Sequence, residues 1–142
     1  MVNSLLGKKI YLDASALIYA TEVPHLFPRL RPSLIEPLAK GELTLVTSWL
    51  TLAEVLIKPL QSSNTVLETI YRQFLTPSAH FEILAADRGI IEQAATLRAA
   101  YGFKLPDAVH IATGMTAGCN HYVTGDLQSA KTGMQVIDVA NL

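Results

Sequence analysis

The sequence predicts an α/β fold with a mostly parallel central sheet that helices cover on both faces. Short apolar runs alternate with longer stretches of helical periodicity, a pattern typical of parallel sheets with helical crossovers. Half of the residues are hydrophobic and 16% are charged, a composition too apolar for a disordered chain. The length of 142 residues fits one domain spanning residues 1–142.

Five strands are expected where a short apolar run is bounded by polar, turn or capping residues. They lie at residues 10–12, 43–47, 81–84, 121–124 and 136–139. Helical spacing predicts six helices between them, at residues 14–21, 32–40, 49–60, 65–75, 88–101 and 105–117. The alternating order of the two element types therefore places most strands side by side in the same direction.

Several expected helices carry residues that begin or end a helix. Ser48 and Asp87 precede two of them as natural N-caps. Pro37 is expected to kink or shorten the helix at residues 32–40, and Pro59 with the polar run after it to close the helix at residues 49–60. Three glycines are expected to end helices: Gly41, Gly102 and Gly118.

Composition excludes some kinds of site and indicates where the chain is located in the cell. The single cysteine, Cys119, excludes a disulfide or a cysteine-based zinc site within the chain. No apolar run reaches the roughly 20 residues of a membrane-spanning helix, and no signal peptide is expected. A cytoplasmic location follows as the default. A net charge of −1 gives no bulk indication of nucleic-acid binding.

Four acids stand out by their position. Asp13 and Asp126 each follow a short strand, and Glu54 and Asp107 lie near the starts of helices. Because the carboxyl ends of parallel strands share one edge of the sheet, these side chains are expected to converge there. Converging carboxylates repel one another unless a cation compensates, and oxygen ligands select Mg²⁺ or Mn²⁺. A metal held in this way suits phosphodiester hydrolysis.

Each acid also has a simpler interpretation. Asp13 could cap the helix that follows it, Asp107 could oppose a helix dipole, Glu54 could be a solvated helix residue, and Asp126 could belong to a turn. His110, one turn after Asp107, is interpreted as a packing or hydrogen-bonding residue. The metal-site interpretation thus depends on the joint placement of the acids.

Four segments, in this order and at these spacings, resemble the PIN-domain family, and most closely its VapC-type toxins: LDASALIYA, TSWLTLAEVL, LPDAVHIAT and HYVTGD. The resemblance spans residues 10–139. It implies a three-layer α/β/α sandwich and a Mg²⁺- or Mn²⁺-dependent ribonuclease that cleaves single-stranded RNA. It also implies a small antitoxin partner and a homodimer.

The resemblance assigns its four acidic positions, as catalytic and metal-binding residues, to the same acids: Asp13, Glu54, Asp107 and Asp126. It further implies that Ser15 and Thr124 supply hydroxyl groups that orient carboxylates or water. The proline-rich segment at residues 22–37 departs from the family pattern. The alternative from another class is a non-catalytic PIN-like module that binds RNA or protein, although such a relative would be expected to have lost some of these acids.

Overall fold

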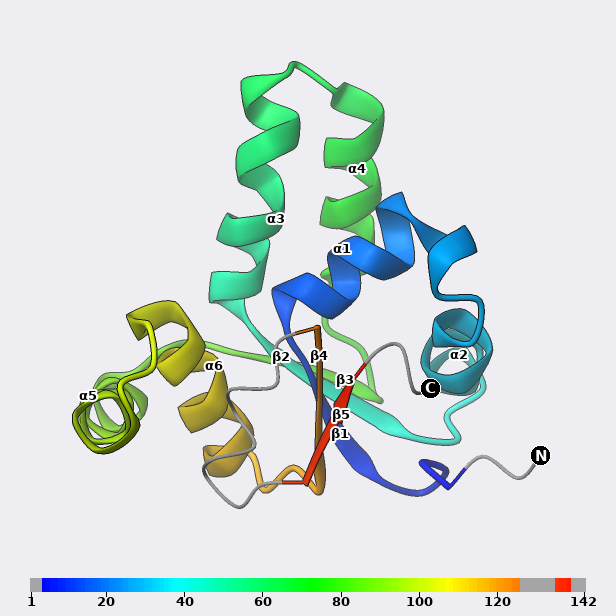
Figure 1. The fold of residues 1–142 in the computed structure, drawn as a ribbon. Helices are drawn as coiled ribbons and strands as arrows, with labels where there is room; N and C mark the ends of the chain where they lie inside the picture. Colours follow the sequence, from blue (N-terminus) through cyan, green and yellow to red (C-terminus); the bar gives the residue numbers. More distant parts are fainter. Residues whose placement is uncertain (1–3, 126–134, 139–142) are drawn as a thin grey trace.

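The sheet has five strands, and each neighbouring pair is parallel (Figure 1). The structure is a computed structural model that describes residues 4–125 and 135–138. The strands are β1 (Lys9–Leu12), β2 (Thr44–Ser48), β3 (Phe81–Leu84), β4 (His121–Thr124) and β5 (Gln135–Asp138), in the spatial order β3-β2-β1-β4-β5. The predicted parallel sheet is confirmed, and β1 lies at its centre.

Helices cover both faces of the sheet and complete the three layers of an α/β/α sandwich (Figure 1). One face carries α1 (Ala14–Glu22), α2 (Glu36–Ala39), α3 (Trp49–Gln61) and α4 (Thr65–Phe74). The other carries α5 (Arg88–Tyr101) and α6 (Leu105–Thr116). No helix in the described part of the chain is long and apolar enough to cross a membrane.

The central strand is apolar on both sides because both faces of the sheet are covered. Ile10 and Leu12 of β1 pack into the core beneath α1, α3 and α4, whereas Tyr11 points into the core beneath α5 and α6. All three are buried. This arrangement explains why the strand is a continuous apolar run instead of alternating with polar residues.

The predicted helix caps form. Ser48 accepts a hydrogen bond from the backbone N–H of Leu50, and Asp87 accepts one from Ile90. Gly102 ends α5 with a φ of 76°, a left-handed conformation that costs glycine little.

The helix expected at residues 32–40 differs in detail from its prediction. A 3₁₀ turn (Pro24–Leu26) precedes the region, and a π-helical turn (Arg31–Ile35) leads into the short α2. Pro37 lies inside α2 and does not end it. Proline cannot donate a backbone hydrogen bond and crowds the preceding turn, which is consistent with the wider turn just before it. The helix α3 contains Pro59 and ends at Gln61, in the polar run where its end was expected.

Candidate active site at the carboxyl edge of the sheet

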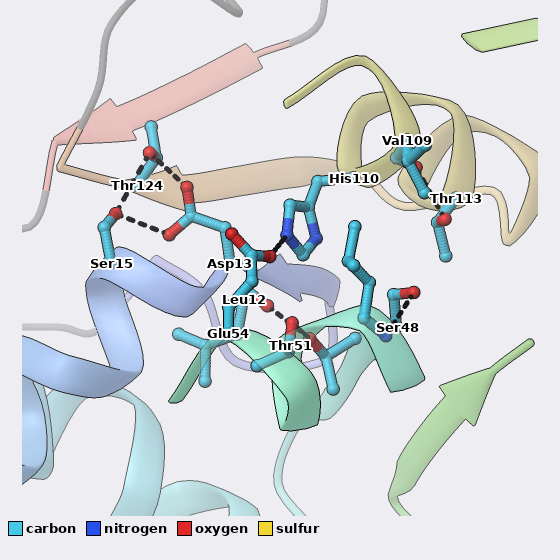
Figure 2. A network of polar contacts seen from close by, with 12 residues as sticks. Leu12, Asp13, Ser15, Ser48, Thr51, Glu54, Val109, His110, Thr113 and Thr124 are labelled. Atoms are coloured by element: carbon cyan, nitrogen blue, oxygen red, sulfur yellow. Dashed lines mark hydrogen bonds and ion pairs between the residues drawn. The ribbon is translucent and has the colours of Figure 1, made fainter. Parts of the chain in front are cut away.

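Asp13 is the most buried of the predicted acids that the structure describes. It follows β1, is 8% exposed and caps α1 by accepting a hydrogen bond of 3.0 Å from the backbone N–H of Ala16. Ser15 donates to the same oxygen, Oδ1, at 2.7 Å, and Thr124 donates to Oδ2 (Figure 2). The helix-cap interpretation is therefore correct, and the same carboxylate also joins β1 to the end of β4.

Ser15 and Thr124 tie two chain segments together around Asp13. Their hydroxyl oxygens lie 3.5 Å apart, and Ser15 Oγ accepts a 2.9 Å hydrogen bond from the backbone N–H of Gly125. A Cβ atom at Gly125 would approach the Tyr19 ring to 2.5 Å, which is closer than atoms pack. The resemblance implied that both hydroxyl groups orient carboxylates or water, and in the structure both hydrogen-bond to the Asp13 carboxylate.

Burial makes the charge of Asp13 costly. Removal from water raises the pKa of the Asp13 carboxyl above its ordinary value. The hydrogen bonds from Thr124, Ala16 and Ser15, and the nearby His110, oppose that rise. A cation bound beside the carboxylate would act in the same direction as these groups.

Glu54 reaches this edge from α3 and contacts His110 of α6. The Glu54 side chain is 32% exposed, and its Oε1 hydrogen-bonds with Nε2 of His110, whose side chain is 3% exposed. The Nδ1 atom of His110 lies 2.6 Å from the Tyr11 hydroxyl. His110 is the residue that the sequence interpretation left outside the site. Its position one turn after Asp107 was the available signal.

Three of the predicted acids raise the pKa of one buried tyrosine, Tyr122. Burial raises the pKa of Tyr122 well above its ordinary value, and the negative charges of Asp13, Asp107 and Glu54 raise it further. Asp107 is half-buried in the first turn of α6. Contributions from all three acids to one pKa indicate that β1, α3 and α6 bring them to the same region.

Comparison with known proteins places this arrangement in a family. The family model of the PIN domain matches residues 10–133. The chain belongs to the PIN domain family. A comparison with curated protein sequences found no match.

Solved structures share the fold at low sequence identity. A toxin–antitoxin complex from Klebsiella pneumoniae matches with a TM-score of 0.71 and 20% identity, over 94% of this chain and 99% of that chain. VapBC2 from Rickettsia felis, bound to a DNA fragment from its promoter, matches with a TM-score of 0.72 and 13% identity, over 92% of this chain and 98% of that chain. The sarcin–ricin loop cleaving toxin VapC20 from Mycobacterium tuberculosis matches with a TM-score of 0.66 and 16% identity, over 88% of this chain and 95% of that chain.

The fourth predicted acid of this PIN domain, Asp126, lies outside the described residues. Within residues 4–125 and 135–138, no three His, Cys, Asp or Glu side chains are grouped to hold a metal ion. Glu54 instead contacts His110. The four-acid metal site therefore stays a prediction.

The chemistry of the available donors fits a hard cation. Asp13, Glu54 and Asp107 offer carboxylate oxygens, the ligands of Mg²⁺ and Mn²⁺. Burial raises the pKa of Cys119 to about 12, so its thiol stays protonated and is a poor metal ligand. A soft-metal site has no comparable support among these residues.

Proposed function

We propose that this PIN domain is a metal-dependent endoribonuclease that cleaves single-stranded RNA and acts as the toxin of a toxin–antitoxin pair. The observation that carries the proposal is the buried Asp13 carboxylate, fixed by Ser15 and Thr124 where β1 and β4 end together. Asp107 and Glu54 reach the same region from α6 and α3. Membership of the PIN family and the toxin neighbours support this choice among metal-dependent phosphodiesterases.

The surroundings of each residue indicate its role in the proposed reaction. Asp13 and Asp107 would hold Mg²⁺ or Mn²⁺, with Asp126 and Glu54 completing the acidic set. The bound metal would supply an activated water and offset the charge of the phosphodiester. Ser15 and Thr124 keep the Asp13 carboxylate from rotating away from the site. The partly exposed Glu54 can orient the attacking water or accept its proton.

The partners follow from the same proposal. RNA is the substrate, the location is the cytoplasm, and a small antitoxin protein blocks the site. A short neighbouring gene for a DNA-binding protein would support the antitoxin. The homodimer belongs to the proposal as well, and the molar mass from light scattering tests it.

Cleavage of a mixed RNA pool tests the activity. We expect the wild-type protein to cut RNA with Mg²⁺ or Mn²⁺ and not with EDTA. Asp107→Asn should lower the rate at least about 100-fold, the scale of losing one group that stabilises transition-state charge. Glu68→Gln is the matched control, since Glu68 is also an acid in the first turn of a helix, α4.

Two results would overturn the proposed mechanism: cleavage that persists in EDTA, or an Asp107→Asn variant as active as the Glu68→Gln control. A wild-type protein that binds RNA but never cuts it would instead support the non-catalytic binding module.

A further inference from the structure

A buried polar chain runs from the central strand to Glu54. It begins at the Tyr11 hydroxyl, which lies 2.6 Å from Nδ1 of His110, and continues from Nε2 of His110 to Oε1 of Glu54. Tyr11 is fully buried and His110 is 2% exposed. The chain therefore joins β1, α6 and α3 at the point where only its last member reaches solvent.

The neutral tautomer of His110 with its proton on Nε2 gives each group in this chain one role, either donor or acceptor. An ionised carboxylate can only accept, so Nε2 of His110 must carry a proton and donate it to Glu54. In the neutral ring, Nδ1 then accepts, and the Tyr11 hydroxyl donates to it. Burial raises the pKa of Tyr11 well above its ordinary value, which keeps the phenol protonated and able to donate.

The Glu54 side chain needs such a support. A free glutamate has several rotatable bonds, and holding its carboxylate in one place costs conformational entropy. Among residues 4–125 and 135–138, the hydrogen bond from His110 is made to Oε1, and Oε2 is the oxygen that would accept from water or bind a cation. In Figure 2 the Glu54 carboxylate lies between His110 and Asp13.

We propose that Tyr11 and His110 are positioning residues that hold the Glu54 carboxylate in its working place at the catalytic edge. His110 contacts Glu54 directly, and Tyr11 acts through His110. This inference rests on the proposed function for what Glu54 does, but the hydrogen-bonded chain itself can be tested without RNA.

The decisive variant is Tyr11→Phe, which removes only the hydroxyl at the start of the chain. Its matched control is Tyr71→Phe. Tyr71 is also fully buried, in the core on the opposite face of the sheet, and its hydroxyl donates to the half-buried Glu22. Both variants lose one buried tyrosine hydroxyl, so a difference between them reports on the chain and not on general stability.

The first measurement is proton exchange of the His110 ring, followed by NMR in metal-free protein. In Tyr11→Phe the Nε2 proton of His110 should exchange with water about tenfold faster. The net free energy of one lost hydrogen bond shifts the local opening equilibrium, from which the proton exchanges, by about that factor. In Tyr71→Phe the rate should equal that of the wild type. Equal rates in Tyr11→Phe and wild type would overturn the inference.

The second measurement is the binding of Mn²⁺ alone, by calorimetry, followed by RNA cleavage. Tyr11→Phe should weaken Mn²⁺ binding or lower kcat by about 10- to 100-fold, the usual effect of losing a group that orients a ligand. KM for RNA should stay within about twofold, since a buried tyrosine touches no substrate. Values like those of Tyr71→Phe would contradict the proposal.

Rescue separates positioning from packing. His110→Gln places an amide N–H near the position of Nε2, so it should retain most of the function that His110→Ala loses. Equal loss in both variants, each shown to fold by circular dichroism, would overturn the positioning role. A wild type that binds no Mn²⁺ and cuts no RNA refutes the proposed function alone, and the ring exchange rates then decide whether the chain holds Glu54.

Discussion

Asp13 holds two roles that oppose each other energetically. As an N-cap it satisfies the backbone N–H of Ala16, and as a buried carboxylate it lacks the solvation that a charge needs. Its hydrogen bonds from Ser15 and Thr124 offset part of this cost. The charge of this carboxylate therefore lowers the stability of the metal-free fold, and the cation that we propose for this site would offset that cost.

Asp13→Asn should make the metal-free protein at least as stable as the wild type at pH 7. Asparagine keeps the capping oxygen and removes the buried charge. The raised pKa means that Asp13 binds a proton more tightly in the folded protein than in the unfolded chain. The stabilisation that this proton gives to the fold is complete below the unfolded pKa of about 3.9 and is lost as the pH rises through the folded pKa. Proton binding that is tenfold tighter in the folded state corresponds to about 1.4 kcal/mol of unfolding free energy.

Urea unfolding in EDTA at several pH values measures this effect. The difference in unfolding free energy between Asp13→Asn and the wild type should shrink as the pH falls toward 4. A difference that is constant with pH, or that grows toward acid, would show that burial does not raise the pKa of Asp13.

Single residues differed in how far the sequence could predict their surroundings. The shared edge of a parallel sheet was enough to place Asp13, whereas Ser15 and Thr124 were assigned to the site by the resemblance to the PIN family. The contact of Glu54 with His110 spans 56 positions and depends on how α3 and α6 approach each other. No local pattern encodes that approach, which is why the sequence supplied the acids but not the partner of Glu54.

At the scale of elements, the start of α3 decides where Glu54 lies. Ser48 is fully buried and caps this helix at the end of β2. Ser48→Ala should lower the unfolding free energy by about 1 kcal/mol and should also lower kcat, because the first turns of α3 would lose their anchor at the site.

Asn64→Ala is the matched variant for this prediction. Asn64 caps α4, which begins at the end of the α3–α4 hairpin away from the sheet (Figure 1). Chemical unfolding should show a comparable loss for both variants, whereas RNA cleavage should fall only in Ser48→Ala. Equal activity in the two would mean that the cap of α3 does not position the site.

The prolines inside helices are where local sequence patterns predicted the elements least well. Caps such as Ser48 and Asp87 act through one short hydrogen bond, so their sequence signal was correct. Pro37 and Pro59 lie inside α2 and α3, and both are buried. Packing of their rings into the core compensates for the missing backbone donor, and such compensation is a tertiary effect that local propensity does not contain.

At the scale of the whole molecule, the parallel sheet followed from the alternation of strands and helices, whereas the strand order did not. The chain adds β2 and β3 on one side of β1 and then β4 and β5 on the other. The order thus reverses beside β1, between β1 and β4, and open α/β sheets bind ligands outside the carboxyl ends of the strands at such a point. Asp13 and Thr124 flank it, so the topology explains why these two residues meet.

Metal binding at this edge of the sheet should stabilise the whole fold. Free Mn²⁺ at about 100 times its dissociation constant adds roughly 2.7 kcal/mol, which corresponds to a rise in Tm of roughly 5–11 °C for a domain of this size. Asp13→Asn should lose this rise. The variant should therefore melt no lower than the wild type in EDTA but below it in Mn²⁺, because the charge that destabilises the metal-free fold is the one that we propose as the cation ligand.

Thermal melts of both proteins in EDTA and in Mn²⁺ at constant ionic strength measure this reversal, the salt being fixed so that screening does not change. Glu68→Gln serves as the control and should gain as much Tm from Mn²⁺ as the wild type does. Equal gains in Asp13→Asn and the wild type would place the cation elsewhere on the molecule. A gain lost in Asp13→Asn but kept in Glu68→Gln would tie the stabilising cation to the carboxylate that joins β1 and β4.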